Sequence, residues 1–342
     1  MKILSIFLLA FVTGIYSYAQ NATSQYKISN KFSVEGDGSW DYLTMDDSTH
    51  HLFISHATMV QVLDVKTGKV IATIPDTKGV HGIALAKDLN KGFISNGKDT
   101  SVTVFDLQKF TTLKKIKVTG NNPDAILYDS FTHRIFTFNG RSKNATVIDA
   151  KTDQVLGTIA LDGKPEFSVS DGAGKIYVNI EDKSKICMIN PLTMKVEQSW
   201  SIDPGKEPSG LALDNKTHRL FSVTDKLMVV VDALTGKVII TLPIGDRVDG
   251  VAFDPDKKCA YSSNGDGTMT VVQEVNENTF KILENVATQK GARTITVDKS
   301  THKIYLPSAE FGETPATTPE NKHPRAPIKP GTFVILEVEP LK

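Results

Sequence analysis

The feature that most constrains the fold of this sequence is a phrase that recurs along the chain at a nearly fixed interval. An apolar segment ends in Asp, a polar turn that often contains Thr-His follows, and a basic residue then opens a second apolar segment. Clear copies begin at Ile126, Leu211 and Ile295. A period of this length indicates one structural unit repeated within a domain. The units open at positions 40 to 44 residues apart, near Asp41, His81, Asp124, Glu166, Ser209, Asp249 and Arg293.

Inside each unit the apolar residues alternate with a period of two, which predicts strands rather than helices. A third strand follows the phrase, for example at residues 102–106 and 228–232. A tight turn with Gly68 or Gly236 then leads to a fourth strand, because Gly tolerates the positive φ of a hairpin turn. Four short strands in about 40 residues are typical of a propeller blade. The sequence therefore predicts an all-β, seven-bladed β-propeller with four-stranded blades.

The two ends of the chain complete this pattern. Residues 333–336 form the third strand of the last unit, which has no fourth strand of its own, while residues 26–32 are left over at the other end. We expect these N- and C-terminal strands to pair, which closes the ring and removes an open sheet edge. The predicted organisation is a signal peptide at 1–19 and a single propeller domain at 20–342, with a long Pro-rich loop at 310–332.

Residues 1–19 have the pattern of a secretory signal peptide. Lys2 precedes an apolar run from Ile3 to Ile15, and small residues follow before Gln20. The alternative is an N-terminal membrane anchor. No other apolar run approaches the ~20 residues of a spanning helix, so we expect no integral membrane segment in the mature chain. The expected location is periplasmic, with secretion or the cell surface as alternatives.

Composition excludes some functions. The 39 basic and 39 acidic side chains give a net charge of zero, so the chain lacks the positive field with which proteins bind duplex DNA. Nucleic-acid binding is therefore the least favoured function. No Cys-x-x-Cys-His motif occurs, which excludes a c-type haem. Cys187 lies in an apolar segment and Cys259 near a turn, and we expect two independent thiols, one of them buried, rather than a disulfide. We also expect a monomer.

Three segments resemble the Tyr-Val-Thr-Asn phrase of the YVTN, or YncE-like, β-propeller family. They are residues 93–97 (FISNG), 135–140 (IFTFNG) and 261–265 (YSSNG). The resemblance extends over the mature chain, and it implies a seven-bladed fold and a periplasmic or surface location. It implies no common chemistry, because the phrase is structural. The Asn is replaced in four units, by His56, Ile180, Thr224 and Ser308.

Polar residues recur at two places in the predicted blades. The residues at the start of each first strand are called the first column, and those at the end of each second strand the second column. Both columns are expected at the same mouth of the central channel, because the first strand begins there and the second strand ends there. We expect a small molecule, a glycan, a peptide or a protein to bind at this polar funnel. The alternative is that the polar groups only solvate a wet channel. The candidate ligand-binding residues are Asp41, His56, His81, Asn96, Asp124, Asn139, Glu166, Asp249, Asn264, Arg293 and Glu310.

A cation-dependent, lactonase-like hydrolase is the main alternative to a binding protein. Oxygen-rich side chains suit Ca²⁺, and His56 and His81 with a carboxylate suit a transition metal. The Gly-x-Ser-x-Gly, P-loop and His-Glu-x-x-His motifs are absent from the sequence, which favours a non-enzymatic function. We therefore assign no catalytic residue, and no metal ligand.

Two further features complete the expectations. The 310–332 loop contains five prolines and lies on the funnel side of the last unit, where loops of this length are often functional. One hypothesis is a lid that brings Lys322, His323 and Arg325 over the mouth, and the alternative is a plain surface loop. The histidines of the Thr-His turns are predicted to have a turn role on the opposite face; they are His50, His133, His218 and His302.

Overall fold

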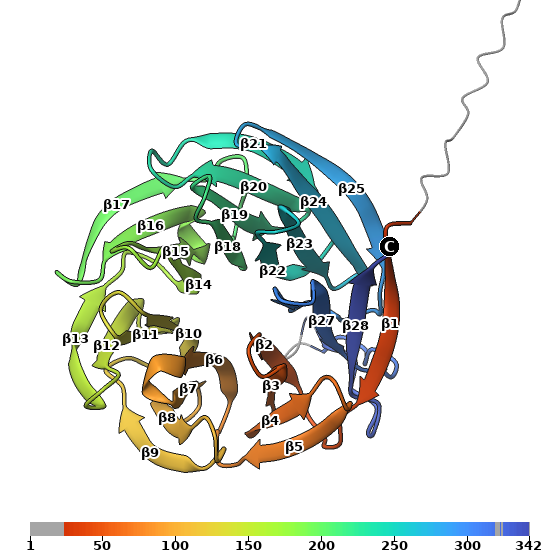
Figure 1. Cartoon of the computed structure of the whole chain (residues 1–342), viewed down its shortest axis with the longest axis horizontal. Helices are drawn as coiled ribbons and strands as arrows, with labels where there is room; N and C mark the ends of the chain where they lie inside the picture. Colours follow the sequence, from red (N-terminus) through yellow and green to blue (C-terminus); the bar gives the residue numbers. More distant parts are fainter. Residues whose placement is uncertain (1–23, 319–321, 323, 342) are drawn as a thin grey trace, which may run out of the picture.

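The strands form seven four-stranded antiparallel sheets, arranged as blades around a central axis (Figure 1). This computed structural model describes residues 24–318, 322 and 324–341. The predicted all-β, seven-bladed propeller is confirmed, while the predicted signal peptide lies outside the described residues. Two single-turn 3-10 helices, η1 (Lys87–Leu89) and η2 (Glu181–Lys183), interrupt the strands. No helix of the described ranges has the length and apolarity to cross a membrane.

Six blades follow chain order, each built from four consecutive strands. Blade 1 contains β2 (Trp40–Asp46), β3 (His51–His56), β4 (Met59–Asp64) and β5 (Lys69–Ile74). Blade 2 contains β6 (Val80–Ala86), β7 (Lys91–Asn96), β8 (Ser101–Asp106) and β9 (Thr112–Lys117). Blade 3 contains β10 (Pro123–Asp129), β11 (Arg134–Asn139), β12 (Asn144–Asp149) and β13 (Gln154–Ala160). Blade 4 contains β14 (Pro165–Ser170), β15 (Ile176–Ile180), β16 (Lys185–Asn190) and β17 (Lys195–Ser201). Blade 5 contains β18 (Leu211–Asp214), β19 (Arg219–Thr224), β20 (Leu227–Asp232) and β21 (Val238–Pro243). Blade 6 contains β22 (Val248–Asp254), β23 (Cys259–Asn264), β24 (Thr268–Asn276) and β25 (Thr279–Ala287).

Blade 7 closes the ring with strands from both ends of the chain. Its order is β26 (Thr296–Asp298), β27 (Lys303–Ser308), β28 (Val334–Pro340) and β1 (Tyr26–Ser33). β1 pairs antiparallel with β28 over its whole length, from Tyr26 opposite Pro340 to Ser33 opposite Val334. The expected pairing of the terminal strands is confirmed.

A buried carboxylate fastens this closure. Glu337 on β28 is 1% exposed and accepts hydrogen bonds from Ser29 and Asn30 on β1, at 2.8 Å each. From β27 it accepts bonds from Lys303 Nζ at 2.9 Å and Tyr305 Oη at 3.0 Å. The register shifts between Ile28 and Asn30, and this bulge brings two consecutive donors of β1 to one carboxylate.

The apolar core lies between the blades. The third strands are buried on both faces, as in β12, whereas outer strands such as β9 are almost fully exposed. Each of the seven core clusters combines side chains of two neighbouring blades, so no blade is buried by itself. Residues that fit a pleated surface, Val, Ile and Phe, supply most of this packing.

The two cysteines belong to this core. Cys187 and Cys259 are both free, which confirms independent thiols. We expected only one of the two thiols to be buried, but both are. Cys259 is 3% exposed and packs with Tyr26 and Tyr261 between blades 6 and 7. Its neighbourhood in the sequence indicated a turn, but β23 begins at this residue and turns its side chain into the core.

The Thr-His turns have the structural role that their repetition predicted. His50, His133, His218 and His302 all have φ between 52° and 61°, a left-handed conformation at the turn between first and second strands. Three of them also connect blades, and in one of these His133 Nδ1 of blade 3 lies 2.9 Å from Asp88 of blade 2. His50 Nδ1 lies 2.7 Å from Asp298 of blade 7, and His302 Nδ1 lies 2.8 Å from Asp254 of blade 6.

We expect Glu337→Gln to lower the free energy of unfolding by about 2 kcal/mol, because it removes the charge from a buried group with four donors. Urea unfolding measures the effect. Glu339→Gln is the matched control on the same strand, where a half-exposed carboxylate pairs with Lys27. We expect less than about 0.5 kcal/mol from it. Equal effects of the two substitutions would contradict the role of Glu337 as the closure hub.

Candidate functional site

The first and second strands of each blade meet at one face of the disc, here called the mouth face. Trp40 at the start of β2 pairs with His56 at the end of β3, and Val80 pairs in the same way with Asn96. The same pairing recurs in blades 3, 4 and 6. The structure therefore places the starts of the first strands and the ends of the second strands at one face, as the sequence predicted.

A histidine joins two aspartates at the centre of this face. His81 Nδ1 lies 2.6 Å from Asp41 Oδ2 and 3.3 Å from Asp124 Oδ1, and the three residues come from blades 1, 2 and 3. Burial opposes a charge on His81, but the hydrogen bond to Asp41 and the charge of Asp124 outweigh it and raise the pKa of the imidazole. His81 therefore tends to hold its proton between two carboxylates.

An arginine extends this arrangement in the other direction. Arg293 Nη2 lies 3.6 Å from Asp41 Oδ1, and its Nη1 pairs with Asp249. Arg293 also approaches the carbonyl oxygen of Trp40, at 3.4 Å. Charged side chains from five consecutive blades are thus connected in one arc.

Glu166 and Lys164 of blade 4 lie beyond Asp124. Lys164 Nζ is 2.5 Å from Glu166 Oε1 and also pairs with Glu181. Burial, together with the charge of Asp124, raises the pKa of Glu166 to about 8. Burial also raises the pKa of Asp124, against the influence of His81. The first column has seven residues, and we call the six ionisable ones, which exclude Ser209, the mouth ring: Asp41, His81, Asp124, Glu166, Asp249 and Arg293.

Two aromatic side chains lie one residue deeper along their strands. Tyr42 follows Asp41 and Phe167 follows Glu166, and their ring centroids are 5.2 Å apart although they belong to blades 1 and 4. Burial raises the pKa of Tyr42, so its hydroxyl stays neutral. This contact bridges the channel beneath the mouth ring and gives the ring an aromatic floor.

The structure does not bring the second column of predicted residues into this ring. Asn96, Asn139 and Asn264 are fully buried, and each amide nitrogen donates to side chains of the third strand in its own blade. Their acceptors are Ser101 and Thr103, Asn144 and Thr146, and Thr268 and Thr270. Because these bonds join two strands of one blade, we leave the three residues out of the proposed site.

His56 is also enclosed by its blade. It is fully buried, its Nδ1 lies 2.7 Å from Gln61 Oε1, and its ring packs against Phe333 with centroids 4.3 Å apart. His56 and His81 therefore do not face a common space, and the predicted pairing of these two histidines around a metal has no support in the geometry.

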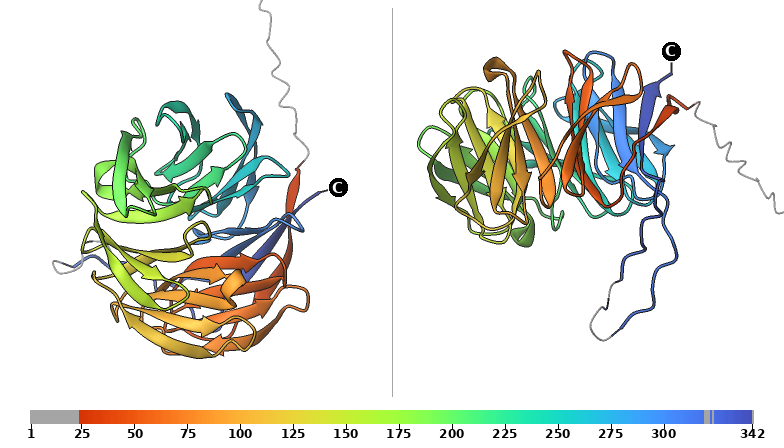
Figure 2. Two further views of the ribbon diagram at one scale, coloured as in Figure 1. Left: turned by 60° about the vertical axis from the view of Figure 1, so that its left-hand side comes forward. Right: turned by 90° about the horizontal axis from the view of Figure 1, so that it is seen from below.

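Glu310 opens the Pro-rich loop and is exposed, with Lys329 Nζ 3.1 Å away. Phe311 and Ile328 form an isolated bridge at the base of the loop. The described part of the loop extends away from the disc on the mouth face (Figure 2). It includes Lys322 and Arg325, while His323 lies outside the described residues. In this conformation the described part does not lie across the mouth ring as the lid hypothesis requires.

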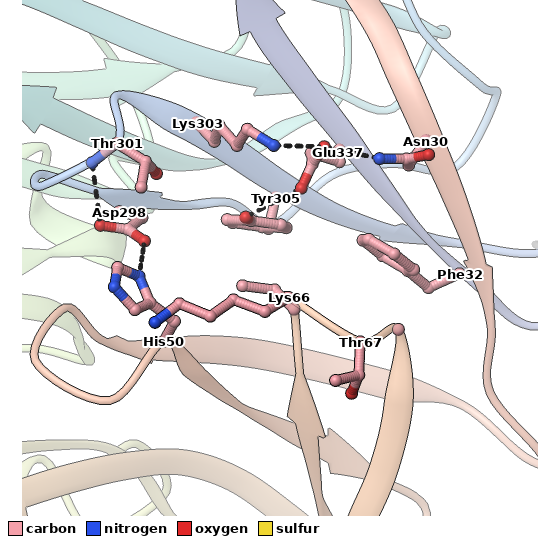
Figure 3. Close-up of a pocket in the computed structure, with 12 residues that line it drawn as sticks. Asn30, Phe32, His50, Lys66, Thr67, Asp298, Thr301, Lys303, Tyr305 and Glu337 are labelled. Carbon is pink, nitrogen blue, oxygen red and sulfur yellow. Dashed lines mark hydrogen bonds and ion pairs between the residues drawn. The ribbon is translucent and has the colours of Figure 1, made fainter.

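A cleft of about 380 Å³ opens on the face opposite the mouth face, between blades 7 and 1 (Figure 3). Its polar side chains are engaged in one contact between the two blades and in two contacts within blade 7. His50 is bonded to Asp298, and Lys303 and Tyr305 are bonded to Glu337. We regard this cleft as the seam of the closure rather than as a ligand site.

Sequence reasoning missed Lys164, which contacts Glu166 from the loop before β14. The signal was present, because Lys164 stands two residues before a first-column position. It was hidden because Lys164 precedes β14 and so lies outside the strand positions that recur with the repeat.

Comparisons with known proteins agree with the fold. No family model matches the chain. Antigen Lp49 of Leptospira interrogans is 23% identical over 237 residues, which cover 60% of this chain and 48% of that protein. The uncharacterized protein YncE of Salmonella typhi is 28% identical over 130 residues, which cover 34% of this chain and 36% of that protein. The matches thus span less than half the length of these relatives.

Solved structures extend the likeness to nearly the whole chain. The structure of U3-55K superposes with a TM-score of 0.74 at 10% identity, covering 93% of this chain and 98% of that one. Kuenenia stuttgartiensis hydrazine synthase superposes with a TM-score of 0.69 at 16% identity, covering 84% and 95%. At these identities the likeness establishes the fold alone.

The raised pKa values of Glu166 and His81 predict that the protein loses stability as the pH rises. Glu166 titrates near 4.5 when unfolded and at about 8 when folded, so its stabilising contribution is present below pH 4.5 and disappears towards pH 8. His81 acts in the same direction above pH 6.5. We expect Tm to fall between pH 5 and 8, and Glu166→Gln to reduce this fall by at least about 2 °C.

Differential scanning fluorimetry across this pH range measures the effect. Glu197→Gln, an exposed carboxylate on β17, is the control and leaves the pH profile unchanged. A profile of Glu166→Gln that matches the wild type would contradict the protonated state of Glu166.

Proposed function

We propose that this chain, a seven-bladed propeller similar to YncE, is an exported binding protein that holds a ligand at the mouth ring. The observation that carries the proposal is the convergence of charged side chains from six blades on one centre. Half-buried charges are unfavourable for folding unless they are paired, and their concentration at one place favours a function there over simple solvation.

The ligand that suits this ring is a polar molecule with both hydrogen-bond donors and acceptors. Each carboxylate of the ring already contacts a cationic side chain of the protein. The ring therefore does not need a bound cation to balance its negative charge. Asp41 and Asp249 offer acceptors, and Arg293 offers donors. The aromatic pair Tyr42 and Phe167 beneath the ring supplies an apolar surface, a combination typical of small-molecule sites.

A cation-dependent hydrolase is the second candidate, and one observation favours it. Ligand atoms of Asp41, His81 and Asp124 lie within 4.8 Å of one another, close enough to surround a metal ion. Such an ion would replace the proton on His81 Nδ1 and polarise a carbonyl or a water. Arg293 beside Asp41 works against a divalent charge at this point, and for this reason we rank the hydrolase below the binding protein.

Ligand binding is tested by thermal-shift screening with pools of sugars, amino acids, organic acids and peptides. We expect a stabilising compound whose affinity falls at least about tenfold in His81→Gln and in Arg293→Gln, because each loses a charge-assisted hydrogen bond. His133→Gln is the matched control in a turn on the opposite face. A binding compound whose affinity both ring variants leave unchanged would place its site elsewhere.

The same assay separates the two candidates. A stabilisation of several degrees by Ca²⁺, Zn²⁺ or Mn²⁺, reversed by chelator and abolished in Asp124→Asn, would replace the binding proposal with the cation-dependent one. No response to these ions, together with a response to an organic ligand, supports the binding protein.

Export is the part of the proposal that rests on residues 1–19. The apolar run after Lys2 and the small residues before Gln20 support cleavage of a secretory signal peptide. We expect the full chain, expressed in a Gram-negative bacterium, to be recovered from the periplasmic fraction with an N-terminus near Gln20. Replacing two Leu of the apolar run by Arg is expected to retain it in the cytoplasm. An uncleaved chain in the membrane fraction would favour the anchor instead.

A further inference from the structure

A small cleft opens on the mouth face between blades 2 and 3, beside the mouth ring. Its volume is about 290 Å³, and it is lined by the loops that follow β7, β9 and β11. The lining residues are Gly97, Lys98, Thr100, Asn121, Asn122 and Arg141. Two cationic side chains, one hydroxyl and two amides thus surround the space, and no carboxylate lines it.

The two cations of this cleft have no carboxylate partner within the described ranges. Lys98 and Arg141 are both exposed and take part in no ion pair there. The nearest acidic neighbour in sequence, Asp99, pairs instead with Lys115 at 3.5 Å. Positive charge is therefore concentrated in the cleft without being neutralised by the protein, a condition that favours an anionic ligand group.

The cleft adjoins the mouth ring. Asn122 lines the cleft, and its Nδ2 lies 3.3 Å from Asp124 Oδ2. Gly97 forms another wall of the cleft and packs closely against His81. A Cβ added to Gly97 would lie only 2.6 Å from His81 Nε2, so the absence of a side chain here lets the imidazole approach the cleft. Asn122 and Gly97 thus place the cleft beside His81 and Asp124 of the mouth ring.

We propose that this cleft binds the anionic group, a carboxylate or a phosphate, of the small molecule whose remaining part occupies the mouth ring. The guanidinium of Arg141 presents a planar fork of donors that matches either group, and Lys98 adds a second charge from the neighbouring blade. A volume of about 290 Å³ exceeds that of a single anion, so part of the ligand body fits there as well. The proposal rests on the proposed function, because it names the ligand class of that site.

The test uses inorganic phosphate and acetate as separate probes, each against sodium chloride at equal ionic strength. We expect at least one of them to stabilise the full-length mature protein more than chloride does. Arg141→Gln and Lys98→Gln are each expected to weaken this response at least about fivefold. A response to phosphate alone identifies a phosphate ligand, and a response to acetate identifies a carboxylate.

Two further variants make the outcome specific. Lys206→Gln removes a charge from the same face beyond blade 4, outside the cleft, and is expected to leave the response unchanged. Asp249→Asn alters the ring on its far side and is expected to keep the anion response while it weakens the organic ligand. An anion response without any organic ligand would support the cleft and reject the ring. The cleft proposal is overturned if neither anion exceeds chloride, or if Lys206→Gln weakens the response as much as Arg141→Gln.

Discussion

Closure of the ring by β1 and β28 is the constraint on which the rest of the molecule depends. Each core cluster is shared by two neighbouring blades, so every blade needs a neighbour on both sides. Without closure, blades 1 and 7 would each expose an apolar face to water. The first strands of the seven blades would then no longer be held around one common axis. Arg293 reaches Asp41 only because blade 7 stands beside blade 1. The mouth ring is therefore a consequence of closure, and the buried Glu337 secures both.

The charges of the molecule are sorted although their sum is zero. Carboxylates at the closure and in the turns are saturated with hydrogen bonds, and this lowers the pKa of Glu337 and of Asp298. At the mouth the balance differs, because burial and mutual repulsion raise the pKa of Asp124 and Glu166. The first set stabilises the fold as the pH rises through the acidic range. The second set opposes folding near neutrality, which is typical of groups retained for function.

Much of the fold followed from the sequence, because a repeat presents the same evidence seven times. The blade count, the four strands per blade and the terminal pairing all came from spacing and period alone. The side-chain positions at the mouth were harder to predict. Whether Asn96 faces the channel or its own blade depends on the direction of one side chain at a strand end, and the hydroxyls of Ser101 and Thr103 decide it. Lys164 was missed for a similar reason, since a flexible loop side chain carries no period.

The two polar columns differ in a way that separates fold from function. At the ends of the second strands the same residue recurs with the same bonds, as Asn96, Asn139 and Asn264 each hold a neighbouring strand through hydroxyl or amide oxygens. At the starts of the first strands the residue varies around the ring, with Asp in three blades and His, Glu, Ser or Arg in the others. A demand of the fold recurs from blade to blade and so favours the same residue, as it does in these three blades. The proposed ligand has no sevenfold symmetry, so a site that binds it would require that the blades differ.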